Sequence, residues 1–300
     1  MTDNVYNRIS RSDLGYDNPF GSKAPVMGVS RHRIVTDGDG VTSLVCFFVC
    51  PLSCRFCLNP LCKDTDYEEF RIIDAAKLYQ HVRMDDLYFR MTKGGITFGG
   101  GEPLCHPAFI TAFHDLCKND GWNLRVETSL NVSEESVKEV APFIHEFIVD
   151  IKDMNPAIYR DYTGVDNSLV MRNLRYLVEQ GAAKRVLVRI PSIEGFNTES
   201  DIQKSKEELL RMGLNRFDFF TYETSLETAY SKTMSGKSVC HYLKELRKAA
   251  ADQNGIAYEP AECHYEGECP GTCPKCEEEL KTLTEQLSLI DSVTPHPLYI

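Results

Sequence analysis

The sequence predicts an α/β fold built on a parallel sheet. Six apolar segments rich in β-branched and aromatic residues alternate with segments that carry helix signals, and this alternation is typical of βαβ units. The first apolar segment, residues 44–49, leads directly into three closely spaced cysteines. Because parallel α/β barrels carry their chemistry on the loops that follow the strands, we expect a functional site at this edge of the sheet.

The composition is that of a soluble globular protein. The 300 residues suffice for one large domain, or for one domain with a small appendage. The formal net charge of −11 argues against a nucleic-acid-binding protein, which usually carries a basic face. No apolar run approaches the ~18 residues of a membrane span, and the first residues do not resemble a signal peptide. We therefore predict a cytoplasmic protein that binds neither nucleic acid nor membranes.

The elements of the core can be placed from local signals. Residues 1–40 are polar and rich in turn-forming pairs, which predicts an irregular arm. Strands are predicted at 44–49, 95–98, 123–127, 147–151, 186–190 and 216–222. Helices are predicted at 72–84, 107–118, 133–147, 167–180 and 201–212. Pro107 suits the first turn of its helix, Ser133 is a helix start signal, and Gly181 ends the helix before it.

The carboxy-terminal part adds two helices. They are predicted at 237–253 and 277–290, with a short strand at 256–259 between them. Leu280, Leu283 and Leu287 recur at helical spacing, and we expect this stripe to dock on the chain's own core rather than on a partner. We therefore divide the chain into an arm at 1–40, a core at 41–225 and a carboxy-terminal extension at 226–300.

Twelve cysteines in a cytoplasmic chain indicate metal ligation rather than disulfides. Cys50, Cys54 and Cys57 have spacings of three and then two intervening residues. A cubic iron–sulfur cluster normally takes four thiolates, so three would leave one iron open to a ligand that is not protein. The alternatives are three buried core cysteines or part of a zinc site. Five other cysteines are scattered singly, and we expect them to be small core residues.

A second cysteine group lies at residues 263–276. Cys269, Cys273 and Cys276 repeat the spacing of the first group, and Cys263 adds a fourth thiol. Four protein thiolates can close a metal site completely, which suits electron transfer or structure rather than catalysis. We predict an auxiliary [4Fe–4S] cluster here, with a structural zinc ion as the alternative.

A glycine-rich segment follows the second predicted strand. Gly99, Gly100 and Gly101 precede Glu102 and Pro103, and consecutive glycines let a backbone approach a ligand closely. The segment lacks the Lys-Ser/Thr pair of a phosphate-binding P-loop. A tight turn between a strand and a helix is the alternative interpretation.

Charged residues end the next three predicted strands. Glu127 ends the third strand, Asp150 and Lys152 end the fourth, and Arg189 ends the fifth. Residues i and i+2 of a strand point to the same face, so Asp150 and Lys152 can both face the interior; a surface ion pair is the alternative. A charge in an apolar strand is costly unless it is paired, so we expect a partner for Arg189.

The residues FFVCPLSCRFCLNP at 47–60, the GGEP motif at 100–103 and the Asp-x-Lys motif at 150–152 resemble the radical S-adenosylmethionine (radical SAM) superfamily. The similarity is greatest to the branch that contains pyruvate formate-lyase activating enzyme. It implies a partial (β/α)6 barrel over roughly residues 30–225 and a [4Fe–4S] cluster on Cys50, Cys54 and Cys57. The open iron would bind S-adenosylmethionine (SAM), and one electron would cleave it to a 5′-deoxyadenosyl radical that abstracts a hydrogen atom.

The resemblance also implies roles for single residues. Phe56 would lie against the adenine, which is compatible with simple packing around the cluster. The backbone of Gly99, Gly100 and Gly101, together with the carboxylate of Glu102, would hold the ammonium group of the methionine moiety.

The strand-end charges receive roles in the same way. Asp150 and Lys152 would contact the cofactor, and Arg189 would meet its carboxylate or a cluster sulfide. Glu127 stands where the family has an acidic residue, usually Asp, beside a monovalent cation. Glu223 stands where the family has a His, so it does not inherit that role. Cys105 follows the glycine-rich segment and is expected to pack.

We therefore predict a radical SAM enzyme that acts on a polypeptide. The substrate is a glycyl radical enzyme or, alternatively, a short ribosomally made precursor peptide, and the resemblance implies a flavodoxin- or ferredoxin-type reductant. A hypothesis of another class is a non-catalytic iron–sulfur protein that carries electrons or senses redox state. Formation of 5′-deoxyadenosine in the presence of dithionite distinguishes the two classes.

Overall fold

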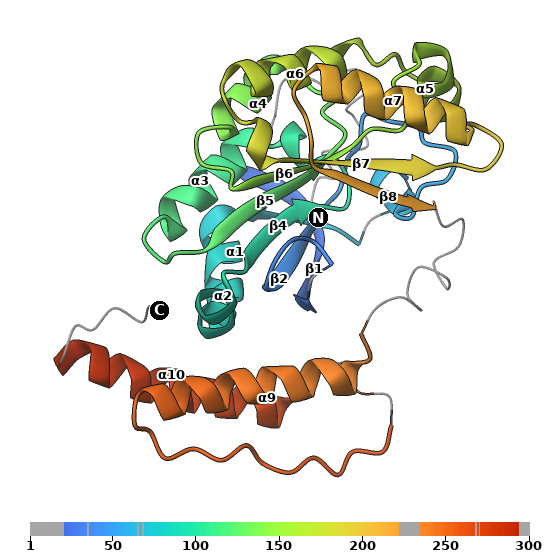
Figure 1. Cartoon of the computed structure of the whole chain (residues 1–300). Helices are drawn as coiled ribbons and strands as arrows, with labels where there is room; N and C mark the ends of the chain where they lie inside the picture. Colours follow the sequence, from blue (N-terminus) through green and yellow to red (C-terminus); the bar gives the residue numbers. More distant parts are fainter. Residues whose placement is uncertain are drawn as a thin grey trace.

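The computed structural model describes residues 21–34, 36–64, 66–67, 69–221, 234–267, 269 and 271–293. Its centre is one eight-stranded sheet with the strand order β3-β1-β2-β4-β5-β6-β7-β8 (Figure 1). Six strands run parallel, and they are β2 (Val41–Phe47), β4 (Gly95–Gly99), β5 (Asn123–Thr128), β6 (Glu146–Asp150), β7 (Val186–Ser192) and β8 (Phe217–Thr221). Over the described residues β3 and β8 are free edges, so the sheet is an open barrel. The predicted α/β fold, its six strands and the partial barrel are confirmed.

Two antiparallel strands extend the sheet beyond β2. Strand β1 (Lys23–Ile34) pairs with β2, and β3 (Arg71–Asp74) pairs with β1. The predicted irregular arm is therefore wrong over β1, whereas residues 1–20 lie outside the described part of the chain. The pairing of β1 with β2 shifts register twice, and such bulges together with Gly28 hide the alternation that identifies a strand in a sequence.

The core helices match the predictions with three differences. They are α1 (Ala75–Val82), α2 (Asp86–Thr92), α3 (Pro107–Cys117), α4 (Glu134–Val140), α5 (Pro156–Thr163), α6 (Ser168–Glu179) and α7 (Glu199–Arg211). Short 3₁₀ helices are η2 (Pro60–Lys63), η3 (Arg83–Asp85), η4 (Pro103–Cys105) and η5 (Ala183–Arg185). The helix predicted at 72–84 begins only at α1, because Asp74 caps it by accepting the N–H of Lys77 (2.8 Å). The helix predicted at 133–147 ends at α4, before Pro142. Helices α2 and α5 were not predicted.

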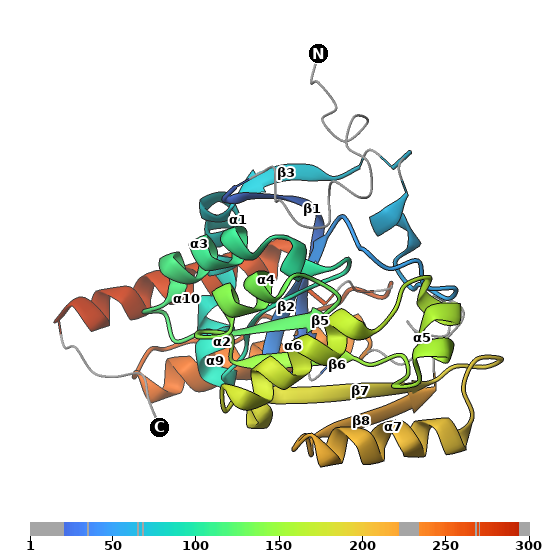
Figure 2. The same cartoon turned by 90° about the horizontal axis from the view of Figure 1, so that it is seen from above.

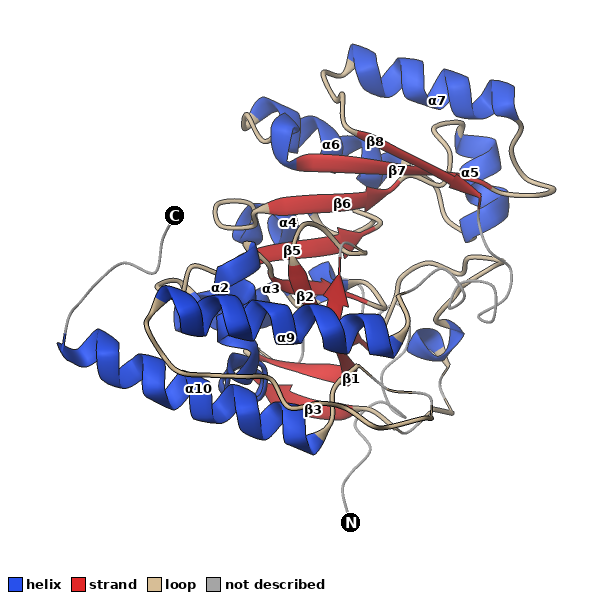
Figure 3. Ribbon diagram, turned by 60° about the horizontal axis from the view of Figure 1, so that its bottom comes forward, coloured by secondary structure: helices blue, strands red, loops and turns tan. Residues whose placement is uncertain are grey.

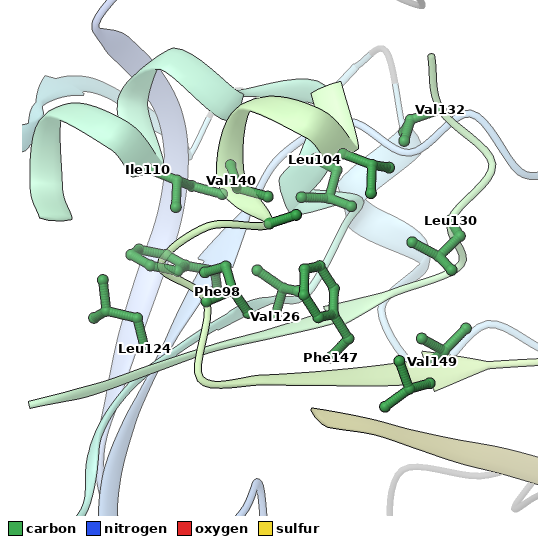
Figure 4. Close-up of a cluster of buried hydrophobic side chains, with 14 of the residues drawn as sticks. Phe98, Leu104, Ile110, Leu124, Val126, Leu130, Val132, Val140, Phe147 and Val149 are labelled. Carbon is green, nitrogen blue, oxygen red and sulfur yellow. The ribbon is translucent and has the colours of Figure 1, made fainter. Parts of the chain in front are cut away.

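The core lies between the sheet and its outer helices. Helices α3, α4, α6 and α7 lie along the outer face (Figures 1 and 2). Phe98, Val126 and Phe147 of neighbouring strands point toward Ile110 of α3 and Val140 of α4 (Figure 4). Each such side chain contributes about 1.5–3 kcal/mol when it is fully buried. The alternate strand residues face the concave side of the sheet, and many of these are polar.

The carboxy-terminal extension docks on the β2–α2 side of the sheet. Helices α9 (Gly236–Gln253) and α10 (Pro274–Val293) lie side by side next to α2 (Figures 1 and 3). Leu280, Leu283 and Leu287 of α10 join one buried cluster with residues of α9, α2 and β2, so their predicted docking on the chain's own core is confirmed.

Two other predictions for the carboxy-terminal part are not confirmed. The strand predicted at 256–259 is wrong, since these residues form no strand; Ile256 and Tyr258 pack against the cluster of α9 and α10 instead. The division into arm, core and extension stays a prediction. No helix among the described residues combines the length and the apolar character needed to cross a lipid bilayer.

Candidate active site

The cysteine loop (residues 50–57) starts from a strained residue at the carboxyl end of β2. Val49 has a φ of +89°, a costly conformation for a β-branched residue. Its N–H donates to the carbonyl oxygen of Cys62 (2.7 Å), and its own carbonyl oxygen accepts the N–H of Glu102 (2.8 Å). These two hydrogen bonds fix the direction in which the chain leaves the strand.

Helix α5 holds the other side of the cysteine loop. The N–H groups of Ser53 and Arg55 donate to the carbonyl oxygens of Thr163 (2.8 Å) and Tyr162 (3.1 Å). The last carbonyl groups of a helix lack partners within the helix, so α5 offers the loop ready acceptors. Asn155-Pro156 at its start and Gly164 (φ +81°) at its end are the sequence signals that could have found α5.

The thiols of the loop lie near one another and near a fourth cysteine. Cys62, which the sequence analysis assigned to the core, is buried within hydrogen-bonding reach of Cys50 and Cys57. The hydrogen bond from Cys62 lowers the pKa of Cys57 to about 6, against the opposing effect of burial. Burial raises the pKa of Cys54 to about 11, and Lys152 counteracts this.

The thiol set fits a cluster better than a single metal ion. Among the described residues, no three Cys, His, Asp or Glu side chains converge on one point as ligands of one ion. In a cubane each thiolate binds its own iron, so such convergence is not required. The closeness of Cys50, Cys54 and Cys57 is therefore compatible with the predicted [4Fe–4S] cluster.

The glycine loop (residues 99–102) rests directly on the backbone before the cysteine loop. The N–H of Gly101 donates to the carbonyl oxygen of Phe47 (3.0 Å). A Cβ atom on Gly101 would overlap the carbonyl oxygen of Val49, and one on Gly100, whose φ is +84°, would lie 2.8 Å from Cα of Cys46. Only glycine permits this contact. The two loops therefore form one unit in which Gly100 and Gly101 are half-buried and carry no side chain that would keep a ligand from the backbone.

Glu102 ties this unit to the end of β5. One of its oxygens accepts hydrogen bonds from the Thr128 hydroxyl (2.6 Å) and the Leu104 N–H (3.2 Å), and the other from the N–H (2.8 Å) and hydroxyl (2.6 Å) of Ser129. Burial raises the pKa of Glu102, and these donors oppose the rise. A ligand ammonium would have to replace one of them, so the predicted contact with SAM stays a prediction.

The strand-end charges form two ion pairs on the concave face. Arg189 Nη1 lies 2.5 Å from Glu127 Oε1, and Lys152 Nζ lies 2.8 Å from Asp150 Oδ2. Burial raises the pKa of Glu127, and Arg189 opposes the rise. For Asp150 the opposite holds, because Lys152 and Arg189 together outweigh burial and lower its pKa. Arg189 thus has the partner that its place in an apolar strand requires, and it also lies 3.5 Å from Asp218 of β8.

A turn that the sequence analysis did not single out lies against these charges. Arg33 forms an ion pair with Asp37, and the carbonyl oxygen of Thr36 accepts a hydrogen bond from Arg189 (3.2 Å). The hydroxyl of Thr97 donates to the carbonyl oxygen of Asp37 (3.0 Å). The Asp-Gly-Asp-Gly run between β1 and β2 therefore lies against the concave face, which its turn-forming composition alone did not reveal.

Aromatic residues surround Phe56. Its ring lies 5.9 Å from that of Phe196, edge to face, and 6.3 Å from that of Tyr162, whose hydroxyl donates to the Phe56 carbonyl oxygen (2.8 Å). Tyr162 and Phe196 are thus additional candidates for an adenine pocket. Glu223 lies outside the described residues.

The pair after the glycine loop has structural surroundings. His106 is buried and stacks on Phe47 at 5.4 Å. Cys105 packs against the main core, and burial raises its pKa well above the usual range. The position of Cys105 is compatible with the packing role expected for it.

The second cysteine group is only partly assembled as predicted. Cys276 lies within hydrogen-bonding reach of Cys273 and 3.9 Å, sulfur to sulfur, from Cys240 of α9. Cys269 accepts the N–H of Gly271 (3.4 Å). Cys263 is exposed. Cys240, which the sequence analysis assigned to the core, was therefore missed as a member of this group.

Comparisons with known proteins complete the description. The sequence model of the radical SAM superfamily matches residues 44–209, more than half of the chain. The chain is 27% identical over 248 residues to pyruvate formate-lyase 2-activating enzyme of Escherichia coli (strain K12), covering 72% of this chain and 84% of that protein. It is 26% identical to 4-hydroxyphenylacetate decarboxylase activating enzyme of Clostridioides difficile (strain CD196), covering 74% and 92%. A crystal structure of a domain of pyruvate-formate lyase-activating enzyme from Bacteroides vulgatus ATCC 8482 is 31% identical, covers 46% of this chain and 89% of that one, and has a TM-score of 0.39.

Proposed function

The chain belongs to the radical SAM superfamily, whose members use a [4Fe–4S] cluster and SAM, and we propose that it activates a glycyl radical enzyme. The polypeptide substrate would lose a hydrogen atom from a glycine Cα. The relatives described above, which are themselves named as activating enzymes, support this substrate class.

One observation carries the proposal: the cysteine loop and the glycine loop are joined at the carboxyl edge of the parallel strands. The hydrogen bonds from Gly101 to Phe47 and from Glu102 to Val49 place the thiol triplet and a half-buried glycine backbone side by side. This pairing supplies a place for an open iron and, beside it, a backbone edge for an ammonium group.

The chain's own residues would hold and orient the cofactors. Cys50, Cys54 and Cys57 would bind three irons of the cluster, which when reduced supplies the electron that breaks a carbon–sulfur bond of SAM. Carbonyl groups of the glycine loop would accept hydrogen bonds from the ammonium group of SAM.

The charged and aromatic residues would position the rest of SAM. Asp150 and Lys152 present opposite charges at the end of β6 and would contact its polar groups. Glu127 orients the guanidinium of Arg189 through their ion pair, and the same guanidinium would also bind the carboxylate of SAM. Phe56, with Phe196 beside it, would face the adenine.

The surroundings of the site suit macromolecular partners. The described sheet ends at the free edge β8, so the barrel is open along one side to a polypeptide segment. Arg55, Arg160 and Asp161 line an open cavity of ≈ 630 Å³ beside the cysteine loop. The two cations outnumber the one carboxylate, which supports docking of an acidic reductant of the flavodoxin or ferredoxin type.

The test uses the full chain, reconstituted anaerobically with iron and sulfide and reduced with dithionite. With SAM alone we expect 5′-deoxyadenosine, and with a glycyl radical enzyme from the same organism we expect a glycyl doublet in the electron paramagnetic resonance spectrum. Cleavage of SAM accompanied by a mass change in a short precursor peptide, and no glycyl signal with any candidate enzyme, would replace activation by peptide maturation. A fully iron-loaded protein that forms no 5′-deoxyadenosine would contradict both and favour an electron carrier.

A further inference from the structure

A short 3₁₀ helix holds the cysteine loop from one side. Helix η2 (Pro60–Lys63) follows the loop along the chain. Lys63 Nζ donates to the carbonyl oxygen of Cys54 (3.1 Å), and the carbonyl oxygen of Cys62 accepts the N–H of Val49 (2.7 Å). The helix therefore contacts both the strand end before the loop and the middle of the loop. Its place in the fold depends on these contacts and not on the side chain of Cys62.

The side chain of Cys62 contacts two of the three predicted cluster ligands. Cys62 is 1% exposed, and its thiol lies within hydrogen-bonding reach of Cys50 and Cys57. Its backbone is fixed by the hydrogen bond from Val49 and by its own N–H, which donates to the carbonyl oxygen of Asn59 (3.2 Å). A buried side chain on a fixed backbone has few positions available, so the thiol stays beside the two sulfurs.

Chemistry decides which of these three sulfurs carries a hydrogen atom when a cluster is bound. Cysteines bind iron as thiolates, so Cys50 and Cys57 can only accept a hydrogen bond. A third negative charge in the same buried contact would be costly, because like charges disfavour the ionised form. Cys62 therefore remains a thiol, and its S–H group is a hydrogen-bond donor.

We propose that Cys62 donates its S–H hydrogen to the ligating sulfur of Cys50 or Cys57 and thereby raises the reduction potential of the cluster. The proposal rests on the [4Fe–4S] cluster of the proposed function, but not on its polypeptide substrate. A hydrogen bond to a thiolate draws negative charge away from the iron, and reduction adds an electron to a cluster whose thiolates are already negative. The hydrogen bond therefore stabilises the reduced cluster more than the oxidised one. Cys62 is thus a positioning residue that acts through the ligands.

The position of Cys62 argues against the other role that a fourth cysteine could have, that of a fourth iron ligand. In a cubane each thiolate binds its own iron, and this holds the ligating sulfurs farther apart than hydrogen-bonding reach. Cys62 instead contacts Cys50 and Cys57 together, which suits a donor in the layer behind the ligands. The fourth iron would then stay open to SAM.

The test is a potentiometric titration of the full-length protein, reconstituted anaerobically with iron and sulfide. The electron paramagnetic resonance signal of the reduced cluster reports the reduced fraction. Cys62→Ala removes the donor and keeps the backbone hydrogen bond from Val49. At a fixed potential we expect the ratio of reduced to oxidised cluster to fall about tenfold, which lowers the midpoint of a one-electron couple by about 59 mV.

Three further variants complete the test. Cys62→Ser retains a donor and should recover most of the loss. Cys62→Val fills the space without a donor and should titrate like Cys62→Ala, so the result does not depend on whether a cavity is tolerated. Cys117→Ala removes a buried thiol of α3 from the main core and should titrate like the wild type.

Several results would overturn the proposal. Wild-type potentials in Cys62→Ala and Cys62→Val would leave the thiol a packing role only. Equal shifts in Cys62→Ala and Cys62→Ser would show that the donor is not the cause. A wild-type spectrum that does not respond to SAM, with a Cys62→Ala spectrum that does, would identify Cys62 as the fourth iron ligand. A wild type that binds no iron would instead contradict the proposed function itself, so the two failures can be told apart.

Discussion

The chain carries two cysteine triplets of identical spacing in unlike surroundings. Cys50, Cys54 and Cys57 lie on a loop at the carboxyl end of a parallel strand, next to a glycine backbone edge. Cys269, Cys273 and Cys276 pack against a helix that brings a further thiol, Cys240, into contact. Each triplet has a further thiol within hydrogen-bonding reach, Cys62 at the first and Cys240 at the second, but the first triplet lies beside the glycine loop. Identical spacing along the chain thus does not give identical surroundings, because the neighbouring elements differ.

Substituting one cysteine in each group gives the largest expected effects. Cys54→Ala should lose the iron of the first site and abolish SAM cleavage, because only two of the three predicted cluster ligands remain. Cys276→Ala should lower the thermal midpoint, because it removes a contact between α9 and α10, while SAM cleavage stays that of the wild type. Iron analysis, 5′-deoxyadenosine formation and thermal unfolding measure the outcomes. Loss of SAM cleavage in Cys276→Ala at unchanged folding would show that the two sites are not independent.

The contact between the glycine loop and the cysteine loop can be broken by one methyl group. Gly101→Ala would overlap the Val49 carbonyl oxygen, and overpacking of this kind costs about 1–3 kcal/mol. We expect SAM cleavage to fall by about tenfold to a hundredfold. Gly28→Ala is the matched control, because a Cβ atom there meets nothing within 4 Å. Equal activity of the two variants would mean that the loops need not touch.

The ion pair between Arg189 and Glu127 should matter less, because both side chains are partly exposed. Arg189→Gln leaves the Glu127 carboxylate without its charged partner, and a hydrogen bond to a charged group contributes about 1.5–3 kcal/mol. The KM for SAM should therefore rise by about tenfold or more, and Arg189→Lys should recover part of the loss. Steady-state formation of 5′-deoxyadenosine measures both. A fall in kcat with unchanged KM would place Arg189 away from the bound cofactor.

The smallest expected effect concerns Asp85, the buried carboxylate that pairs with Arg31 of β1. Burial alone would raise the pKa of Asp85, but the hydrogen bonds from Arg31 and His32 outweigh it and lower the pKa. A carboxylate with a lowered folded-state pKa stabilises the fold above its unfolded-state pKa, and this stabilisation is lost as the pH falls. Denaturant unfolding of the wild type should therefore lose stability below about pH 4. Asp85→Asn should be less stable at pH 7 and show a flatter acid dependence. If the stability of the wild type and of Asp85→Asn fell equally with pH, Asp85 would not be the group that causes the acid dependence.

Much of the core could be predicted because its signals are local. The six parallel strands are apolar runs, and Pro107 and Ser133 mark where α3 and α4 begin. Strand β1 was not predicted because its bulges interrupt the alternation of buried and exposed side chains that identifies a strand. Helix α5 was not predicted although Asn155-Pro156 marks its start.

The candidate site also has parts that local sequence signals reveal and parts that they do not. The triplet, the glycine loop and the strand-end charges are visible as motifs, but their partners come from distant parts of the chain. Glu102 meets Ser129 across 27 positions, and Cys240 meets Cys276 across 36. A single sequence does not show which residues far apart in the chain come into contact. A scattered cysteine such as Cys240 gives no signal until α9 and α10 are packed together.

The left-handed turn at Val49 has a consequence for how the cofactor is received. A β-branched residue at a φ of +89° persists only where its surroundings over-determine it, here through the hydrogen bonds to Cys62 and from Glu102. The conformational entropy of this junction is consequently lost during folding, so little ordering remains when the nucleoside arrives. Replacing Val49 with glycine would make the junction more flexible in the folded protein. The junction would then lose this conformational entropy when the cofactor binds and no longer during folding.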